Sequence, residues 1–474
     1  MALGVLTQSI FEFRRFVRRY ERLFERKAQR RHFEAYLRGL IGPLERKSIE
    51  PIALDQRVNW RSLQDFIGNS PWDAESVLTE HRGHVRETLG TSRGIFILDP
   101  TSFPKRGDKT VGVARQWCGQ LGKEENCVVA GVLAYASERG HALLDRRLYL
   151  PELWAGNLAR RRKAGVPDDV VFRTSGELAY EMITQARRER VPHAWITGDE
   201  EFGKLPWLQD WLDEDGERYI LEVPCLTCVW TALPRGRKLG PKGISERLRR
   251  RGPGRPRLVR VDALLRQVPK RAWTLHEIRG GSKGPIRVRA VLLRIRLHRK
   301  KRMQRDGWLL MTRTVDQRPQ TKYFLSNAAS NASIMELLRA GFARWPVEQC
   351  FGQEKNETGL GDFETRSWLG WHHHTALAFL AHHWLVLERN RLGEKISRDD
   401  DGRSATCLLC RGADGTPATT RLATSDASSA GSESRCAHLA LEEGTSRSSR
   451  PSAAQARGVG PREVRNSHVP LNSA

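Results

Sequence analysis

The chain has 474 residues, of which 80 are Lys or Arg and 55 are Asp or Glu, giving a formal net charge of +25 at pH 7. Such an excess is typical of proteins that bind a polyanion, because each neutralised phosphate releases condensed counterions. No uninterrupted apolar run of about 18 residues is present, which argues against a membrane-spanning helix. Eight irregularly spaced cysteines do not form the pattern of a disulfide scaffold. We therefore expect a cytoplasmic, nucleic-acid-binding protein with no membrane partner.

The amino-terminal part predicts helices. Residues 8–40 repeat large apolar side chains at intervals near 3.6, opposite a strongly basic face. Residues 60–89 continue as helices, with Ser70 or Asp73 as an N-cap. The basic face is either a solvated helix surface or a surface that contacts DNA. We expect residues 1–90 to form a helical, DNA-binding domain.

From residue 94 onward the pattern changes to short apolar runs and two amphipathic helices, which predicts a mixed sheet with helices on its faces. The first run, GIFILD, ends in Asp99, and a later run, HAWITGD, ends in Asp199. The predicted strands are 94–99, 126–137, 141–151, 193–199 and 218–224, and the predicted helices are 175–191 and 205–215. This order matches the ribonuclease H-like fold, which we assign to residues 91–224 as the first part of a core.

Residues 225–330 alternate basic, Gly- and Pro-punctuated segments with β-like runs. This composition predicts a β-rich insertion with a positive surface, and its strands are expected at 286–297, 307–314 and 321–327. The segment RRRGPGRPRLVR contains Arg255 and Arg257 in and beside a Gly-Arg-Pro core. It resembles an AT-hook, which lies in the narrow minor groove of DNA. A solvated basic loop is the alternative.

Helices are predicted again at 333–360 and 372–392, so we expect residues 331–392 to complete the core. Residues 393–474 are rich in Ser, Ala, Gly, Thr and Arg and nearly lack large apolar side chains. Such a segment cannot offset the entropy of ordering, which predicts a disordered tail. A frame-shifted or degenerate end is the alternative.

Chemistry is suggested first by Asp99 and Asp199. Sites in open sheets collect beyond strand ends, so two acids there could share a metal ion, although each could also be a turn cap. In ARWPVEQCFGQEK, Arg344, Glu348 and Lys355 are spaced by 4 and 7 residues and would share one helix face. An exposed Arg–Glu pair, worth about 0.5 kcal/mol or less, is the simpler interpretation of that spacing.

Two strand-end aspartates followed by Arg-x3-Glu-x6-Lys resemble the DDE transposases of bacterial insertion sequences, in the branch with a β-rich insertion before the glutamate. Supporting similarities are LDPTSFPKRG, GVARQWCGQLGKEENCVV, RRLYLPELW, RRRKAGVP and ETRSWLGWHHH, and the resemblance covers roughly residues 20–392. Three features depart from the family. Gly341 stands where the family has Tyr, and Glu200 or Glu201 competes with Asp199 for the second acidic position. The tail beyond residue 392 matches nothing in the family.

The resemblance implies that Asp99, Asp199 and Glu348 form the catalytic triad and bind Mg²⁺, with Mn²⁺ as a possible substitute. Two such ions, about 4 Å apart, activate the attacking oxygen and stabilise the leaving oxygen. Carboxylates are the hard oxygen ligands that these ions prefer. The resemblance also implies phosphate contacts by Arg344 and Lys355. Further candidates for contacts to DNA are Lys105, Arg106, Arg115, Arg255 and Arg257.

The function implied is metal-dependent cleavage of double-stranded DNA at inverted-repeat ends and strand transfer to target DNA, by a homodimer on paired ends, at the bacterial nucleoid. One alternative is a catalytically disabled relic that only binds DNA, and another is a nuclease or structural protein acting on RNA.

Other patterns have two interpretations each. The pairs Cys225/Cys228 and Cys407/Cys410 have zinc-ligand spacing but lie far apart in the sequence. The run of histidines at 372–374 is interpreted as core packing or phosphate contact rather than metal binding. Trp230 and Trp308 pack in a core or stack on a distorted base.

Overall fold

The computed structural model describes residues 2–231, 258–279, 285–298, 305–316, 318–344 and 357–393. Residues 249–257 of the AT-hook-like segment and residues 394–474 of the tail that we predicted to be disordered lie outside the described residues. Everything described belongs to one structural unit, Met1–Thr420. Within that part of the chain, no helix is both long and apolar enough to cross a membrane.

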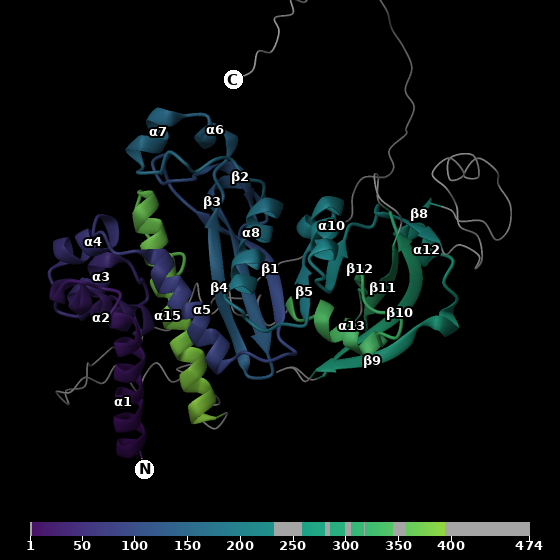
Figure 1. Cartoon of the computed structure of the whole chain (residues 1–474), viewed down its shortest axis with the longest axis horizontal. Helices are drawn as coiled ribbons and strands as arrows, with labels where there is room; N and C mark the ends of the chain where they lie inside the picture. The colour runs from purple at the N-terminus through teal and green to yellow at the C-terminus, as the bar shows by residue number, and fades with distance from the viewer. Residues whose placement is uncertain are drawn as a thin grey trace, which may run out of the picture. The chain divides into compact units, whose positions relative to one another are not determined.

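Five helices precede the sheet, as predicted (Figure 1). They are α1 (Ala2–Glu21), α2 (Lys27–Ile41), α3 (Ile49–Asp55), α4 (Trp60–Gly68) and α5 (Ala74–Thr88). The single helical pattern at 8–40 is therefore divided between α1 and α2. Of the two predicted caps, Asp73 caps α5, because its carboxylate accepts hydrogen bonds from the N–H groups of Glu75 and Ser76.

The long helix α15 (Trp368–Leu392) packs beside α5 and β4 (Gly140–Leu148) and joins the amino-terminal helices to the sheet (Figure 1). It is buried on nearly all sides, and the rings of Phe13 and Trp384 meet edge-on with centroids 5.3 Å apart. The apolar segment of this helix, which is too short and too interrupted by polar residues to span a membrane, is thus part of the protein core.

Twelve strands of the described residues form one mixed sheet, which confirms the predicted ribonuclease H-like α/β fold class. Strands β1, β5 and β6 are parallel to one another, and the other pairings are antiparallel. Along the sheet the order is β2 (Ala114–Cys118), β3 (Lys123–Ser137), β1 (Ile95–Pro104), β5 (Trp195–Gly198), β6 (Tyr219–Val223), β12 (Thr321–Ser326), β11 (Asp306–Thr314), β10 (Ile286–Leu297), β7 (Cys228–Thr231) and β8 (Leu258–Arg260). Off this path, β4 pairs with β3 and β9 (Thr274–Arg279) pairs with β10.

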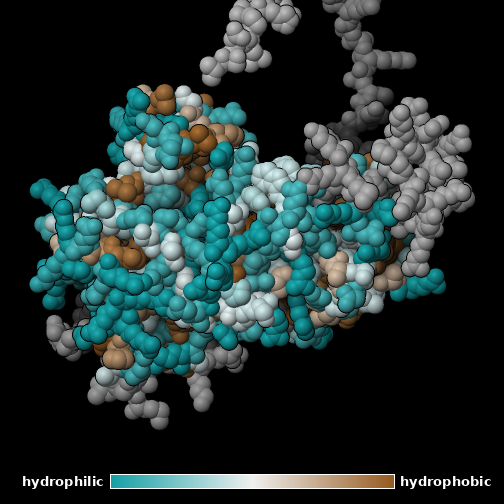
Figure 2. All heavy atoms as spheres, viewed as in Figure 1, coloured by the Kyte–Doolittle hydropathy of each residue, from teal (hydrophilic) through white to brown (hydrophobic). Residues whose placement is uncertain are grey.

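The three β-like runs of the insertion form β10, β11 and β12, as predicted. Because β12 pairs with β6 through Phe324 and Glu222, these strands extend the sheet that carries the strand-end acids. The remaining helices of the described chain are α6 (Glu152–Ala155), α7 (Leu158–Lys163), α8 (Ser175–Arg188), α9 (Glu200–Gly203), α10 (Pro206–Glu214), α12 (Val261–Leu265), the 3-10 turn Lys270–Ala272 and α13 (Ile334–Gly341). Figure 2 shows mostly hydrophilic side chains on the visible face, with hydrophobic ones gathered over α6 and α7.

Buried histidines make the packing of α5 against α15 sensitive to acid. His81 is fully buried, its Nε2 lies 2.7 Å from the carbonyl oxygen of Leu143, and burial lowers its pKa to about 3. Burial likewise lowers the pKa of His84 to about 4, and the rings of His84 and His383 are 4.8 Å apart. These imidazoles are therefore neutral in the folded protein well below the pH at which they protonate in the unfolded chain.

We expect the free energy of unfolding to be fully retained above pH 6.5 and to fall as the pH drops below it. These histidines then take up protons in the unfolded state only. For His81 alone, this lowers the free energy of unfolding by about 2 kcal/mol at pH 5. Urea unfolding at pH 7.5, 6 and 5 measures this slope. An unfolding free energy that stays constant over that range would contradict the neutral buried histidines.

Candidate active site

Three acidic side chains form a row across the parallel strands. Leu98 of β1 pairs with Gly198 of β5, which pairs in turn with Leu221 of β6. The residues one position further along these strands are Asp99, Asp199 and Glu222. Neighbouring strands lie about 4.8 Å apart and lateral neighbours share a face of the sheet. The fold therefore brings two of the predicted site residues together and adds a third carboxylate.

The guanidinium of Arg344 contacts all three carboxylates. Its Nη2 donates to Oδ1 of Asp99 at 2.8 Å and lies 3.9 Å from Oδ2 of Asp199. Its Nη1 donates to Oε2 of Glu222 at 3.3 Å. All four side chains are mostly buried, with 10% to 25% exposed. Partial exclusion of water strengthens such charge-assisted contacts.

Asp99 lies in the middle of β1, so the prediction that the strand ends at this residue was wrong. Pairing with β5 stops at Leu98, whereas pairing with β3 continues to Pro104. Beyond Leu98, the strand pairings of the described residues continue on the β3 side, and Pro100 lies in this stretch, a position at the edge of parallel pairing that proline tolerates. Asp99 is thus held by a paired strand at the point where its parallel neighbour has ended.

Asp199 directly follows β5 and caps α9, which is the turn-cap role considered for it. Its Oδ1 accepts a hydrogen bond from the N–H of Glu201 at 3.0 Å, while Oδ2 faces Arg344. Burial raises the pKa of the Asp199 carboxyl, against the lowering effect of Arg344. The charges of Glu201 and Glu222 also raise this pKa, whereas the hydrogen bond from the N–H of Glu201 lowers it. Burial also raises the pKa of Glu200. The site therefore gathers several carboxyl groups in a poorly hydrated place, where the guanidinium of Arg344 offsets part of their charge.

Two glycines set the close packing around this row. A Cβ on Gly203 would lie 1.8 Å from the carbonyl oxygen of Glu222, so only glycine lets α9 approach β6 this closely. A Cβ on Gly341 would lie 3.2 Å from Cδ1 of Ile220. The ring of a Tyr at position 341 would need neighbouring side chains to move, which gives a packing reason for the departure from the family pattern.

Glu348 and Lys355 lie outside the described residues, as do Arg255 and Arg257. In the part of the chain that the structure describes, no group of three or more His, Cys, Asp or Glu side chains is arranged to hold a metal ion. The donor chemistry of Asp99 and Asp199 nevertheless fits Mg²⁺, because both carry hard carboxylate oxygens, which the guanidinium of Arg344 contacts in this structure.

The predicted DNA contacts differ in accessibility. Lys105 bonds to the carbonyl oxygens of Gly361 and Phe363 at 3.2 and 2.6 Å, and burial lowers its pKa to about 8. These contacts give Lys105 a structural role in fixing the segment before α15. Arg106 and Arg115 are exposed. Arg115 pairs with Asn126, six residues along β3 from the partner of Asp99, and is thus roughly 20 Å from the acidic row.

The histidine run packs in the core. His373 and His374 are fully buried, and Nδ1 of His374 lies 2.8 Å from the hydroxyl oxygen of Tyr36. Trp230 is also buried, and its indole donates to His298. Trp308 donates its indole N–H to the carbonyl oxygen of Ala329 and lies beneath the guanidinium of Arg294.

The cysteine pairs have no shared zinc site among the described residues. Cys225 and Cys228 are free thiols, and the other pair lies outside the described residues.

Glu222 was missed by the sequence analysis. The signal was present in RYILEVP, where a single carboxylate interrupts an otherwise apolar, central strand. A buried charge needs a partner, so such a residue marks either an ion pair or a site. Its lateral alignment with the two aspartates depends on the register of three strands, which the sequence alone does not provide.

Comparison with known proteins identifies the family of the chain. A family model described as DDE superfamily endonuclease matches residues 19–285, more than half of the chain, and this range contains Asp99, Asp199 and Glu222. Over 107 residues the chain is 40% identical to a probable transposase for insertion sequence element IS701 from Microchaete diplosiphon. That match covers 21% of this chain and 27% of the relative, so it spans about a quarter of the relative's length.

Proposed function

The chain belongs to the DDE superfamily of endonucleases, and from this we propose that it is a transposase that cuts DNA at the ends of an insertion sequence and joins those ends to a target. The observation that carries the proposal is the placement of Asp99 and Asp199 on adjacent parallel strands beneath one guanidinium. The net charge of +25 supports a DNA partner.

In this proposal Asp99, Asp199 and Glu348 hold Mg²⁺, for which Mn²⁺ can substitute. The bound metal would supply activation of the attacking water or 3′-hydroxyl and stabilisation of the leaving oxygen. The two aspartates contribute fixed, inward-facing carboxylates, because paired backbone holds one and a helix cap holds the other. Their rigidity keeps the reacting groups in line and limits the reorganisation that the reaction requires.

Arg344 and Lys355 would bind phosphates near the scissile bond. The planar guanidinium of Arg344 can form two parallel hydrogen bonds to a phosphate once its carboxylate partners are otherwise neutralised. Arg106 and Arg115, which are exposed, together with Arg255 and Arg257, would contact the DNA backbone further away. We further propose a homodimer on two inverted-repeat ends, since a two-fold symmetric assembly matches a pair of inverted sites. Acting on chromosomal DNA, it would be located at the nucleoid.

The test is incubation of the purified protein with a duplex that carries the terminal inverted repeat of its own element. We expect a nick or cut at the repeat boundary that appears with Mg²⁺ and disappears with EDTA, and single-stranded RNA should compete poorly. Steeply salt-dependent binding of the duplex without any metal-dependent product would instead identify a DNA-binding relic. Preferential cleavage of RNA would overturn the assignment to transposition.

A further inference from the structure

Glu222 belongs to the same electrostatic unit as the two aspartates, although neither the family motif nor its spacing includes it. It stands on β6, in register with Asp199, and its side chain is only 10% exposed. Besides Arg344, it contacts the ammonium of Lys322 at 3.1 Å from each carboxylate oxygen. Glu222 is therefore a buried anion between two cations, one of which also contacts Asp99 and Asp199.

Arg344 would compete with a metal ion for the aspartates. Its closest contact, at 2.8 Å, is to Oδ1 of Asp99, an oxygen that a metal ligated by this carboxylate would share or take. A guanidinium and a divalent cation repel each other at such short range. When Asp99 and Asp199 bind a cation, Arg344 must lose part of its present coordination and find another acceptor.

Building on the proposed function, we propose that Glu222 is a positioning residue that retains Arg344 at the active site when the two aspartates take up metal. The Nη1 contact to Glu222 is made by a different nitrogen from the one that faces the aspartates. The guanidinium can thus release the aspartates while it stays anchored through Nη1. The nitrogen that it withdraws from the aspartates is then available to a phosphate group.

Lys322 gives this arrangement a second support. It is 40% exposed and reaches Glu222 from β12, on the side away from the aspartates in the strand order. Its contact with both carboxylate oxygens fixes the orientation of Glu222 even when Arg344 shifts. Lys322 therefore keeps Glu222 in place independently of Arg344.

The experiment is a double-mutant cycle on metal binding by the full chain. Mn²⁺ affinity is measured by electron paramagnetic resonance at one fixed pH, without DNA. Glu222→Gln is expected to raise the Mn²⁺ dissociation constant about tenfold, because displaced Arg344 then loses the charge-assisted contact to Glu222. In an Arg344→Gln background the same change should alter the constant less than about twofold, since nothing remains to be displaced. Glu152→Gln, on exposed α6, is the control and should leave the constant unchanged.

The outcomes separate this inference from the function on which it rests. Equal weakening of Mn²⁺ binding by Glu222→Gln in both backgrounds would make Glu222 a metal ligand and overturn the positioning role. No weakening in either background would also overturn the positioning role. Asp99→Asn should abolish Mn²⁺ binding whatever Glu222 does, and failure of that control would count against the proposed site itself. The Mg²⁺ concentration for half-maximal cleavage provides a second readout and should rise in parallel. If Glu222→Gln does not fold, Glu222→Asp tests the same contact by shortening it.

Discussion

Asp99→Asn and Asp199→Asn are each expected to lower the rate of metal-dependent DNA cleavage at least ~100-fold. Asn preserves the shape of the side chain but removes the negative charge, so that metal affinity and the partnership with Arg344 are lost together. Metal ions stabilise the transition state of phosphoryl transfer by several kcal/mol, and each 1.36 kcal/mol corresponds to a factor of ten in rate. Gel-based cleavage of a labelled end duplex measures the effect.

Binding of the duplex should be retained in both variants, because removal of an anion does not weaken attraction to a polyanion. Asp108→Asn is the matched control, since this exposed aspartate lies in the loop after β1, away from the acidic row, and should cut like the wild type. Cleavage by Asp99→Asn at the wild-type rate would remove this residue from the mechanism.

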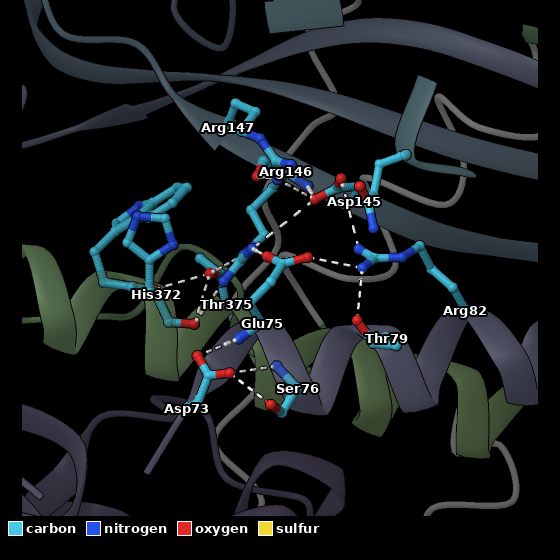
Figure 3. A network of polar contacts seen from close by, with 12 residues as sticks. Asp73, Glu75, Ser76, Thr79, Arg82, Asp145, Arg146, Arg147, His372 and Thr375 are labelled. Atoms are coloured by element: carbon cyan, nitrogen blue, oxygen red, sulfur yellow. Dashed lines mark hydrogen bonds and ion pairs between the residues drawn. The ribbon is translucent and has the colours of Figure 1, made fainter. Parts of the chain in front are cut away.

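Asp145→Ala is expected to reduce the free energy of unfolding by about 3–5 kcal/mol, the cost of breaking a buried ion pair by removing one partner. Figure 3 shows the network in which this carboxylate lies. Its side chain is fully buried, and Oδ1 accepts hydrogen bonds from Arg147 at 2.6 Å and from the N–H of Arg146 at 2.7 Å. Oδ2 lies 3.6 Å from the buried guanidinium of Arg82. In the alanine variant, the buried guanidinium groups of Arg82 and Arg146 would lose a neighbouring negative charge.

The same network connects elements that are distant in the sequence. Arg82 of α5 bonds to Glu189 at 2.6 Å. Arg146 of β4 donates to Thr375 of α15 at 3.0 Å (Figure 3). Loss of Asp145 should therefore loosen the contact between the helical region and the sheet. The urea midpoint followed by circular dichroism at pH 7.5 measures the change.

A matched exposed pair provides the comparison for Asp145. Glu138→Ala removes the partner of Arg93, and both of these side chains are largely solvated. We expect a much smaller loss there than for Asp145→Ala, because exposed ion pairs contribute little. Similar urea midpoints for the two variants would show that the buried network is not a major source of stability.

The sequence allowed the sheet to be predicted where local patterns coincide with tertiary structure. The apolar runs of β1, β5 and β6 and the cap at Asp73 follow from burial and from N-cap chemistry, both of which act over a few residues. Strand β2 was missed because its segment, ARQWC, lies between glycine-containing turns and exposes Arg115 and Trp117. Its strand conformation is imposed by pairing with β3.

The candidate site was only partly predictable for the same reason. Asp99 and Asp199 were identifiable as acids after apolar runs, and Arg344 from its spacing to Glu348. Glu222 could not be assigned to them, because its place depends on parallel register between strands that are far apart in the chain. Nor could the contact of Arg344 with the aspartates be foreseen, since it depends on α13 packing closely on β6 through Gly341.

The central claim is that carboxylates from positions 99, 199 and 348 converge on one divalent cation. Anomalous diffraction from a crystal grown with Mn²⁺ and an end duplex tests it most directly. We expect an anomalous peak at about 2.1 Å from oxygens of Asp99, Asp199 and Glu348, with the guanidinium of Arg344 turned to a phosphate. A peak elsewhere in the molecule, or Glu348 on the opposite face of the sheet, would contradict the account.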